Sequence, residues 1–187
     1  YLDAGYIAPN PYRRVLENED YPDHKVIAAF CGDVLAGSVR AVIDARPEQR
    51  LFSLHCFEPF QLWPWAEALL RDVETERLMQ IGTMVIRDEF RGGVVRQVLM
   101  QRLTEMLVEA GTRFAAATVD ERFFNSLSSR NVPLVPMGDT LHYMGSRTVP
   151  VIVAREWVTR GVVPASIRAL AQRSAGAVAL QAAGCGA

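Results

Sequence analysis

The segment MQIGTMVIRDEFRGGVVRQVLMQRLTEML, residues 79–107, constrains the fold of this chain more than any other stretch. It predicts a long strand over 77–88, an Arg-Gly-Gly turn at 91–93 and an amphipathic helix over 94–110, whose apolar residues recur every three or four positions. Gly82 stands inside the strand, where a glycine indicates a bulge or a close backbone approach. A strand that enters a helix through glycines leaves free amides at the positive end of the helix dipole, so the unit favours a bound anion.

Composition, charge and cysteine spacing indicate what class of protein contains this unit. The chain has 187 residues, of which 50% are hydrophobic and 22% charged, and this is the composition of one folded domain. A net charge of -1 gives no reason to expect a nucleic-acid partner. Cys31, Cys56 and Cys185 lack C-x-x-C spacing and the histidines are scattered, so we expect neither a disulfide framework nor a metal site.

The sequence also carries expectations about location. It shows no signal peptide and no apolar run of transmembrane length, which predicts a cytoplasmic protein. The chain begins at Tyr1 without a methionine, so we expect that an N-terminal segment precedes it.

The remaining elements follow from local pattern. We expect a β-hairpin over 25–44, a short helix over 63–74, a strand over 113–119, a helix over 121–130, final strands within 132–155 and an Ala-rich helix after Pro164. A glycine-marked long strand that feeds a long helix through Arg-Gly-Gly resembles the core of the GNAT acyltransferase fold. The resemblance implies an α/β fold (a mixed α+β sheet) with helices on both faces. The acyltransferase domain would span 1–154, with a helical extension and tail over 155–187.

In a GNAT-like site an amine attacks a thioester, and the long strand carries the chemistry. A bulge would splay this strand from its parallel neighbour and expose backbone groups to the pantetheine arm. We therefore place the catalytic groups at Gln80, Gly82, Thr83 and Met84, and donor binding at Met84, Val85 and Ile86. A plain packing bulge at Gly82 remains the alternative.

The turn before the helix predicts how the donor is held. The usual GNAT pattern, Arg-Gly-x-Gly-x-Gly/Ala, would start at Arg91, and Gly92 and Gly93 follow it. Val94 and Arg96 stand where small residues would let the backbone close around a pyrophosphate. These five residues are our donor-binding candidates, and they suit the single phosphate of a phosphopantetheine arm on an acyl carrier protein better than coenzyme A. Four arginines are expected to crowd this rim and attract the acidic carrier: Arg87, Arg91, Arg96 and Arg102.

Further motifs narrow the resemblance. YLDAGYI at the start, DYPD over 20–23, GSVRAVI over 37–43, LFSLHCFEPF over 51–60 and MQIGTMVIRDEFRG together resemble the autoinducer-synthase branch of the GNAT superfamily, most of all the FeeM-like N-acyl amino acid synthases. The homoserine-lactone synthases carry Asp-x-x-Asp, Gly-x-x-Arg and Glu-x-Ser-Arg. The first two match Asp20 with Asp23, and Gly37 with Arg40. In the third motif, Gln80 stands for the Glu and Thr83 for the Arg, which favours the N-acyl amino acid branch.

The resemblance implies transfer of a long fatty acyl chain from acyl carrier protein to the amino group of an amino acid, with no bound cofactor and with the phosphopantetheine thioester or acyl-coenzyme A as donor substrate. Asp20, Asp23 and Arg40 are the acceptor-binding candidates. The aspartates could instead be solvated loop residues, and Arg40 could pair with them or hold the acceptor carboxylate.

Several roles stay open. Because glutamine does not titrate, the general base would be a water on strand carbonyls or an aspartate of the 20–23 loop, unless the amine arrives neutral. The helix over 121–130 has Phe123 and Phe124 but no Tyr to protonate the leaving thiolate. Phe52, Phe57, Phe60, Trp63 and Trp65 suit either core or an acyl tunnel. A coenzyme A-dependent acetyltransferase and a non-catalytic GNAT-like domain that binds an acyl carrier or a small ligand remain the alternative functions.

Overall fold

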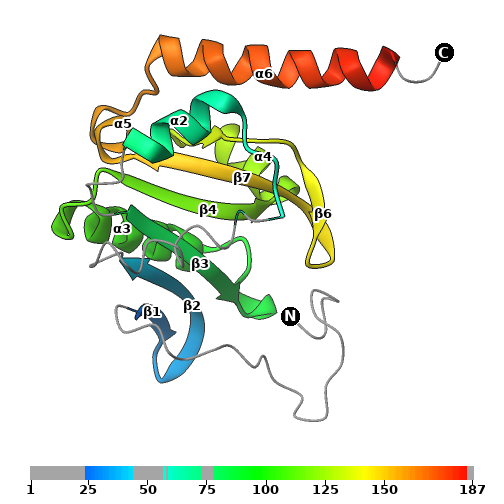
Figure 1. Cartoon of the computed structure of the whole chain (residues 1–187). Coiled ribbons are helices and arrows are strands. Elements are labelled where there is room, and N and C mark those ends of the chain that lie inside the picture. The colour runs from blue at the N-terminus through cyan, green and yellow to red at the C-terminus, as the bar shows by residue number, and fades with distance from the viewer. Residues whose placement is uncertain (1–23, 44–56, 58, 73–77, 185–187) are drawn as a thin grey trace.

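A computed structural model describes the backbone of residues 24–43, 57, 59–72 and 78–184 (Figure 1). Its elements in chain order are β1 (His24–Cys31), β2 (Val34–Ile43), α2 (Pro64–Asp72), β3 (Leu78–Ile86), a 3₁₀ turn (Asp88–Phe90), α3 (Val94–Glu109), β4 (Phe114–Asp120), α4 (Glu121–Ser128), β5 (Val135–Pro136), β6 (Leu141–Tyr143), β7 (Ser146–Ala154), α5 (Arg155–Arg160) and α6 (Ala165–Gly184). The predicted hairpin, long strand, long helix and the elements after them are all present, with ends that differ by a few residues.

Within the described residues, seven strands form one mixed sheet in the order β1-β2-β3-β4-β7-β5, and β6 also pairs with β7. Only β3 and β4 run parallel; the other pairs are antiparallel. The helix α3 connects β3 to β4, as a parallel pair requires a crossover. Helices cover both faces of the sheet: α3 and α4 lie behind it in Figure 1, and α2 lies over the other face. The first turns of α6, at the top in Figure 1, pack into the same core as α2. The predicted fold class is therefore confirmed.

Each face of the sheet has its own apolar core. Alternation along β3 sends Met79 toward α3 and Leu78 toward α2, because successive strand residues point to opposite faces. Under α3, the buried residues recur every four positions: Val95, Leu99, Leu103 and Leu107. Under α2, the core joins Trp63, Phe114, Ile152 and Trp157. Trp157 belongs to α5, and its ring meets that of Phe114 edge-on at 6.3 Å.

Two residues of the predicted apolar helix face are not buried. The side chains of Val94 and Val98 are 65% and 48% exposed. A helix on one face of a sheet buries only the stripe that touches the strands, and these two valines lie beside that stripe. Both valines lie near the start of α3, where a donor is expected to bind.

The division into residues 1–154 and 155–187 remains a prediction about domain limits. The helix α5 nevertheless packs into the same core as the sheet through Trp157 and the backbone bond from Arg155 N to the carbonyl of Arg113, 2.8 Å long. The first helix of the segment 155–187 therefore packs into the same core as the sheet.

Candidate functional site

The candidate site lies where the two parallel strands separate. The strands β3 and β4 pair only from Leu78 to Gln80 against Phe114 to Ala116. Beyond this point β3 runs on to Ile86 and β4 to Asp120 with no further pairing between them. Gln80 is therefore the last β3 residue paired with β4, at the narrow end of the gap. By alternation with Leu78, its side chain lies on the face that α2 covers.

A bulge in β3 begins next to Gln80. Val39 of β2 pairs with Met84 and Ala41 pairs with Ile81, so the single residue Arg40 stands opposite two residues, Gly82 and Thr83. Two residues against one is the definition of a β-bulge, which bends the strand and increases its twist. The bulge expected from Gly82 is present, and it accounts for the separation of β3 from β4.

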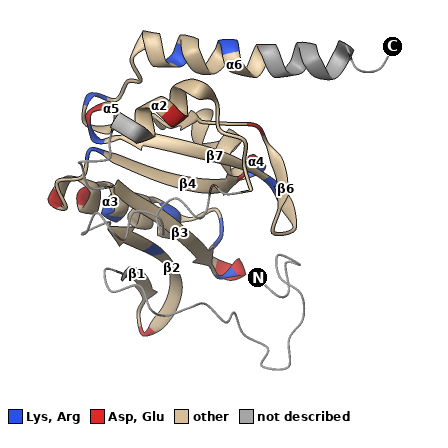
Figure 2. Cartoon of the chain, in the orientation of Figure 1, with Lys and Arg blue, Asp and Glu red and all other residues tan. Residues whose placement is uncertain are grey.

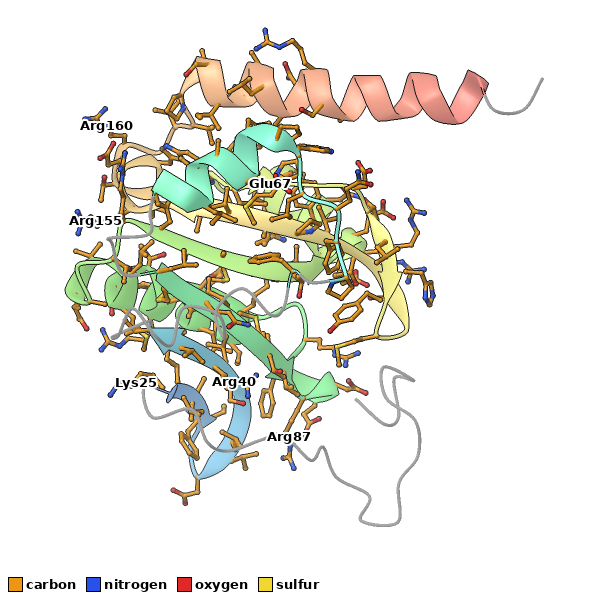
Figure 3. All side chains as sticks on the ribbon, viewed as in Figure 1. Lys25, Arg40, Glu67, Arg87, Arg155 and Arg160 are labelled. Atoms are coloured by element: carbon orange, nitrogen blue, oxygen red, sulfur yellow. The ribbon has the colours of Figure 1, made fainter. Side chains whose placement is uncertain are left out.

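The reason for a glycine at this bulge is Arg40. A Cβ placed on Gly82 would lie 2.9 Å from Nε and 3.3 Å from one terminal nitrogen of Arg40, so the arginine side chain occupies the space above the glycine. The Nε atom of Arg40 is buried. Figure 3 shows Arg40 reaching from β2 toward β3. Arg40 and Gly82, which are predicted to serve acceptor and thioester, are therefore in direct contact.

The backbone of β3 presents free groups to the gap. The amide of Arg87 bonds to the carbonyl of Ala36, 3.0 Å away, and the bonded pairs of an antiparallel ladder alternate from there. Val85 is therefore the next residue bonded to β2, whereas Met84 and Ile86 direct their N–H and C=O groups toward the side of β4. Of the three predicted donor-binding residues, Met84 and Ile86 offer backbone groups to a ligand in the gap. Val85 offers its side chain, which is 42% exposed.

The start of α3 borders the wide end of the gap. Gly92 has φ 77°, which favours glycine, and Gly93 is the N-cap of the helix, with no side-chain cap. No atom lies within 4 Å of a Cβ placed on Gly92. The first amides of the helix are therefore uncapped by side chains and approachable, as an anion site requires. Val94 and Arg96 follow directly, so the predicted donor residues do gather at this helix end.

The expected basic rim requires a correction. Three of its four arginines form ion pairs: Arg91 with Asp88 at 2.9 Å, Arg87 with Glu89 at 3.6 Å, and Arg102 with Glu109 at 2.8 Å. The 3₁₀ turn before α3 places its two carboxylates beside the loop arginines, and α3 places Glu105 and Glu109 in reach of Arg102. The hydrogen bonds that Arg102 donates to Glu109 and Glu105 raise the pKa of its guanidinium above the ordinary value. Arg96 alone of the four forms no ion pair with any described residue.

Asp20 and Asp23 lie outside the described residues, so their contact with Arg40 stays a prediction. On the α2 face of the site, the polar side chains of the described strands include Ser38 and Arg40 of β2 and Gln80 and Thr83 of β3. By alternation with Phe114 and Ala116, Thr118 of β4 lies on the same face. The described residues contain no group of three or more histidines, cysteines or carboxylates that could hold a metal ion.

A second close glycine contact, which the sequence did not predict, lies at Gly37. Its Cβ would stand 2.8 Å from the carbonyl oxygen of Val85 and 3.2 Å from Cγ1 of Val95. This close approach lets the first turn of α3 settle on β2 where β3 ends, and it orients the helix end toward the gap. A glycine in the strand pattern was the available signal, as it was for Gly82.

Two acidic residues at the far side of the gap also escaped attention. Asp120, the last residue of β4, caps α4 by accepting hydrogen bonds from the amides of Arg122 and Phe123, at 2.9 and 3.2 Å. Glu121 accepts from Nε of Arg147 at 2.7 Å, and this bond holds the pKa of the Glu121 carboxyl below its ordinary value. At the end of β4, the Asp120 carboxylate therefore serves as a helix cap and the Glu121 carboxylate as the partner of Arg147.

The aromatic residues divide by position. Phe57 and Trp63 are buried in the core under α2, and the indole N–H of Trp63 donates to Asp139 at 2.9 Å. Phe60 meets the ring of Tyr143 edge-on at 5.5 Å. Trp65 packs against the same core, and its buried Nε1 has no hydrogen-bond partner in the part of the chain that the structure describes. Phe52 lies outside the described residues. The core interpretation therefore holds for Phe57 and Trp63.

Comparisons with known proteins rest on structure. No family model matches the sequence, and no curated protein matches it. Among solved structures, FeeM, an N-acyl amino acid synthase from uncultured soil microbes, superposes with a TM-score of 0.56 at 12% identity, over 76% of this chain and 73% of that one. BjaI, a CoA-dependent acyl-homoserine lactone synthase solved with SAM and isopentyl-CoA, gives 0.57 at 14% identity, over 89% and 72%. MesI, another CoA-dependent acyl-homoserine lactone synthase, gives 0.54 at 12%, over 84% and 79%.

These similarities show that the chain has a GNAT-type fold like that of these three structures. At such identities the likeness extends to the fold and not to individual side chains. No described helix is both long and apolar enough to cross a bilayer.

Proposed function

We propose that this chain, with its GNAT-type fold, is an N-acyltransferase that moves a long fatty acyl group from a phosphopantetheine thioester to the amino group of an amino acid. The amine nitrogen attacks the thioester carbonyl carbon and loses a proton. The carbon–sulfur bond then breaks, and the thiolate leaves and takes up a proton. No bound cofactor is needed, since the acyl donor is itself a substrate.

The observation that carries the proposal is the gap between β3 and β4 next to an uncapped helix start. The parallel pairing stops at Gln80, and Met84 and Ile86 direct backbone groups into the space beyond it. An extended pantetheine arm has amides that can pair with such a strand edge, as a peptide does in strand addition. Its phosphate would then reach the first amides of α3, where the helix dipole favours negative charge. The thioester would lie beside the bulge, where a backbone N–H can stabilise the developing oxyanion.

The acceptor would lie over the bulge, on the side of Arg40. The guanidinium rests on Gly82, at the point where the thioester is proposed to sit. A carboxylate held by Arg40 would place the α-amino group of an amino acid close to the thioester carbonyl, because only the Cα separates the two groups. Gln80 cannot take up the proton in neutral water, so we assign it the positioning of a water or of the amine.

Two donors remain to be distinguished. Carrier protein is our first choice because Val94 and Arg96 replace small residues at the helix start, and because exposed Val94 beside Arg96 offers a mixed apolar and basic contact to a protein partner. Acyl-coenzyme A is the second candidate, favoured by the ion pairs that neutralise Arg87, Arg91 and Arg102. BjaI and MesI are described as CoA-dependent, and FeeM as an N-acyl amino acid synthase.

The direct test is product analysis. Purified protein is incubated with palmitoyl-carrier protein or palmitoyl-coenzyme A and a mixture of the twenty amino acids, and organic extracts are analysed by mass spectrometry. We expect one or a few N-palmitoyl amino acids. Arg40→Met should raise the KM for the amino acid and leave the KM for the donor unchanged. Absence of any acylated amino acid with either donor would leave a GNAT-fold binding domain as the better description.

The donor test uses Arg96 and a matched control. Arg96→Gln removes the one rim charge that has no ion pair among the described residues, whereas Arg102→Gln removes a charge already neutralised by Glu105 and Glu109. We expect Arg96→Gln to lower kcat/KM for acyl-carrier protein by about three- to tenfold at low salt, less at high salt, and to affect acyl-coenzyme A less. Arg102→Gln should change neither. Equal losses with both donors, or preference of the unmutated protein for acyl-coenzyme A, would assign coenzyme A as the donor.

A further inference from the structure

A cavity lies at the other edge of the sheet, away from the proposed reaction site. It holds about 680 Å³ and is bounded by the end of α4, the edge strand β5, the turn after α5 and one side of α6. Ligand pockets for small organic molecules have volumes of roughly 300–1,000 Å³. From β3 to β5 the sheet order crosses β4 and β7. Three strand spacings are about 14 Å, so the cavity and the bulge at Gly82 are separate places on the sheet.

The lining of the cavity is apolar with one charged residue. Val135 belongs to the edge strand β5, and Leu134 is the residue before it. Val162 lies in the turn between α5 and α6. Val162 remains 51% exposed, which leaves apolar surface uncovered in the cavity wall. Arg168 and Gln172, one helical turn apart on α6, supply polar groups. Among the residues that line the cavity there is no carboxylate, and Arg168 makes no ion pair within the described part of the chain.

The charge of the surrounding segment has the same sign. Residues 155–187 contain four arginines and one glutamate, so this segment carries three net positive charges although the whole chain carries -1. Figure 2 shows the described part of α6 with basic positions and no acidic one. A positive side chain that is not neutralised, beside an uncovered apolar wall, is complementary to an anion with an apolar tail.

We infer that this cavity is a second binding site, for a long-chain carboxylate. The carboxylate would accept hydrogen bonds from Arg168 and Gln172, and the alkyl chain would lie on Leu134 and Val162. Two sources have this chemistry: a free fatty acid, and an N-acyl amino acid of the kind proposed as the product. Only the second source depends on the proposed function. The proline residues at 133 and 136 interrupt the hydrogen-bonding edge of β5, which disfavours an added peptide strand as the occupant.

The test measures binding directly, by isothermal titration calorimetry of the full chain with dodecanoate, N-dodecanoylglycine and dodecanol below their micelle concentrations. Arg168→Gln removes the charge, and Ala175→Trp places a large ring on the cavity side of α6. Arg173→Gln is the matched control, because Arg173 lies on the same helix but does not line the cavity. Gly82→Ala alters the reaction site alone and reports whether the ligand binds there instead.

We expect one site for dodecanoate, with binding weakened about tenfold or more by Arg168→Gln, abolished by Ala175→Trp and unchanged in Arg173→Gln and Gly82→Ala. N-dodecanoylglycine should lose the same site in Arg168→Gln, and as a product it should also bind the reaction site. Dodecanol should bind equally to the unmutated protein and Arg168→Gln. Tighter binding of dodecanoate or of N-dodecanoylglycine identifies the source, and dodecanoate binding is informative even if no acyl transfer is found. Carboxylate affinity that is the same in Arg168→Gln, or that is lost only in Gly82→Ala, overturns the inference. The inference is also overturned if no carboxylate binds and light scattering shows that Ala175→Trp changes the molar mass of the protein in solution. The cavity would then be a contact between two copies of the chain.

Discussion

Replacing Gly82 with alanine tests the contact between the bulge and Arg40. The new Cβ would stand 2.9 Å from Nε of Arg40, closer than unstrained Cβ contacts, so the arginine side chain must move. Such overpacking costs about 1–3 kcal/mol. The φ of Gly82 is not in the left-handed region, so alanine also reduces the entropy of the unfolded chain and regains about 0.4–1 kcal/mol. We therefore expect a net loss of about 0.5–2 kcal/mol in the free energy of unfolding.

The assay is urea unfolding of four proteins: unmutated, Gly82→Ala, Arg40→Ala and the double variant. If the clash with Arg40 is the cause, Gly82→Ala should be neutral or slightly stabilising once Arg40 is alanine. The coupling free energy should then reach about 1–2 kcal/mol, as for residues in contact. In a chain of this size, a loss of 1 kcal/mol lowers Tm by about 2–4 °C.

Gly176→Ala is the control, because a Cβ there has no atom within 4 Å and the residue lies inside α6. It should be neutral or stabilising by up to about 1 kcal/mol. A coupling below about 0.5 kcal/mol between Gly82 and Arg40 would refute the argument that the glycine exists to admit the arginine.

Three further outcomes are expected. Gly37→Ala should lower the free energy of unfolding by about 1–3 kcal/mol in urea, because its Cβ would stand 2.8 Å from the backbone oxygen of Val85; a loss below about 0.5 kcal/mol would contradict this. Gln80→Ala should reduce turnover by less than about tenfold while Gln80→Glu retains or raises it, and unmutated rates in Gln80→Ala would exclude Gln80 from the site. The Glu121 pKa is lower in the folded chain, so its bond to Arg147 should stabilise above pH 4.5, the ordinary value, and lose that contribution as the pH falls through the lower folded pKa. Unfolding between pH 7 and pH 3 should show this loss, and Glu121→Gln should lack it.

Much of the site was predictable from one stretch of sequence because its order is local. Alternating and helical periodicities, Gly82 within the strand and Arg-Gly-Gly before Val94 together predict a bulged strand that enters a helix. Backbone preferences and nearest neighbours determine these features, and both can be read along the chain. The mixed sheet with helices on both faces followed from the order of such elements and from the resemblance that they support.

Local pattern could not predict which charges neutralise each other. Arg91 and Arg102 appear as free cations in the sequence, yet Asp88 and Glu109 pair with them. Whether two side chains meet depends on rotamers and on the exact path of the turn and helix, which periodicity does not specify. The same limit explains Val94 and Val98, which look apolar enough for the core but lie outside the stripe that touches the sheet.

The tertiary structure alone decided the position of β4. Three residues of β4 pair with β3, and the whole of α3 lies between the two strands in the sequence. Local sequence does not specify where this pairing stops. The gap that would hold a thioester exists because a bulge opposite Arg40 turns β3 away while β4 continues straight along β7. The cavity behind β5 likewise joins segments that lie up to about fifty residues apart. Local sequence therefore determined the elements, whereas packing between distant segments determined the spaces between them, since those spaces depend on how rigid elements meet.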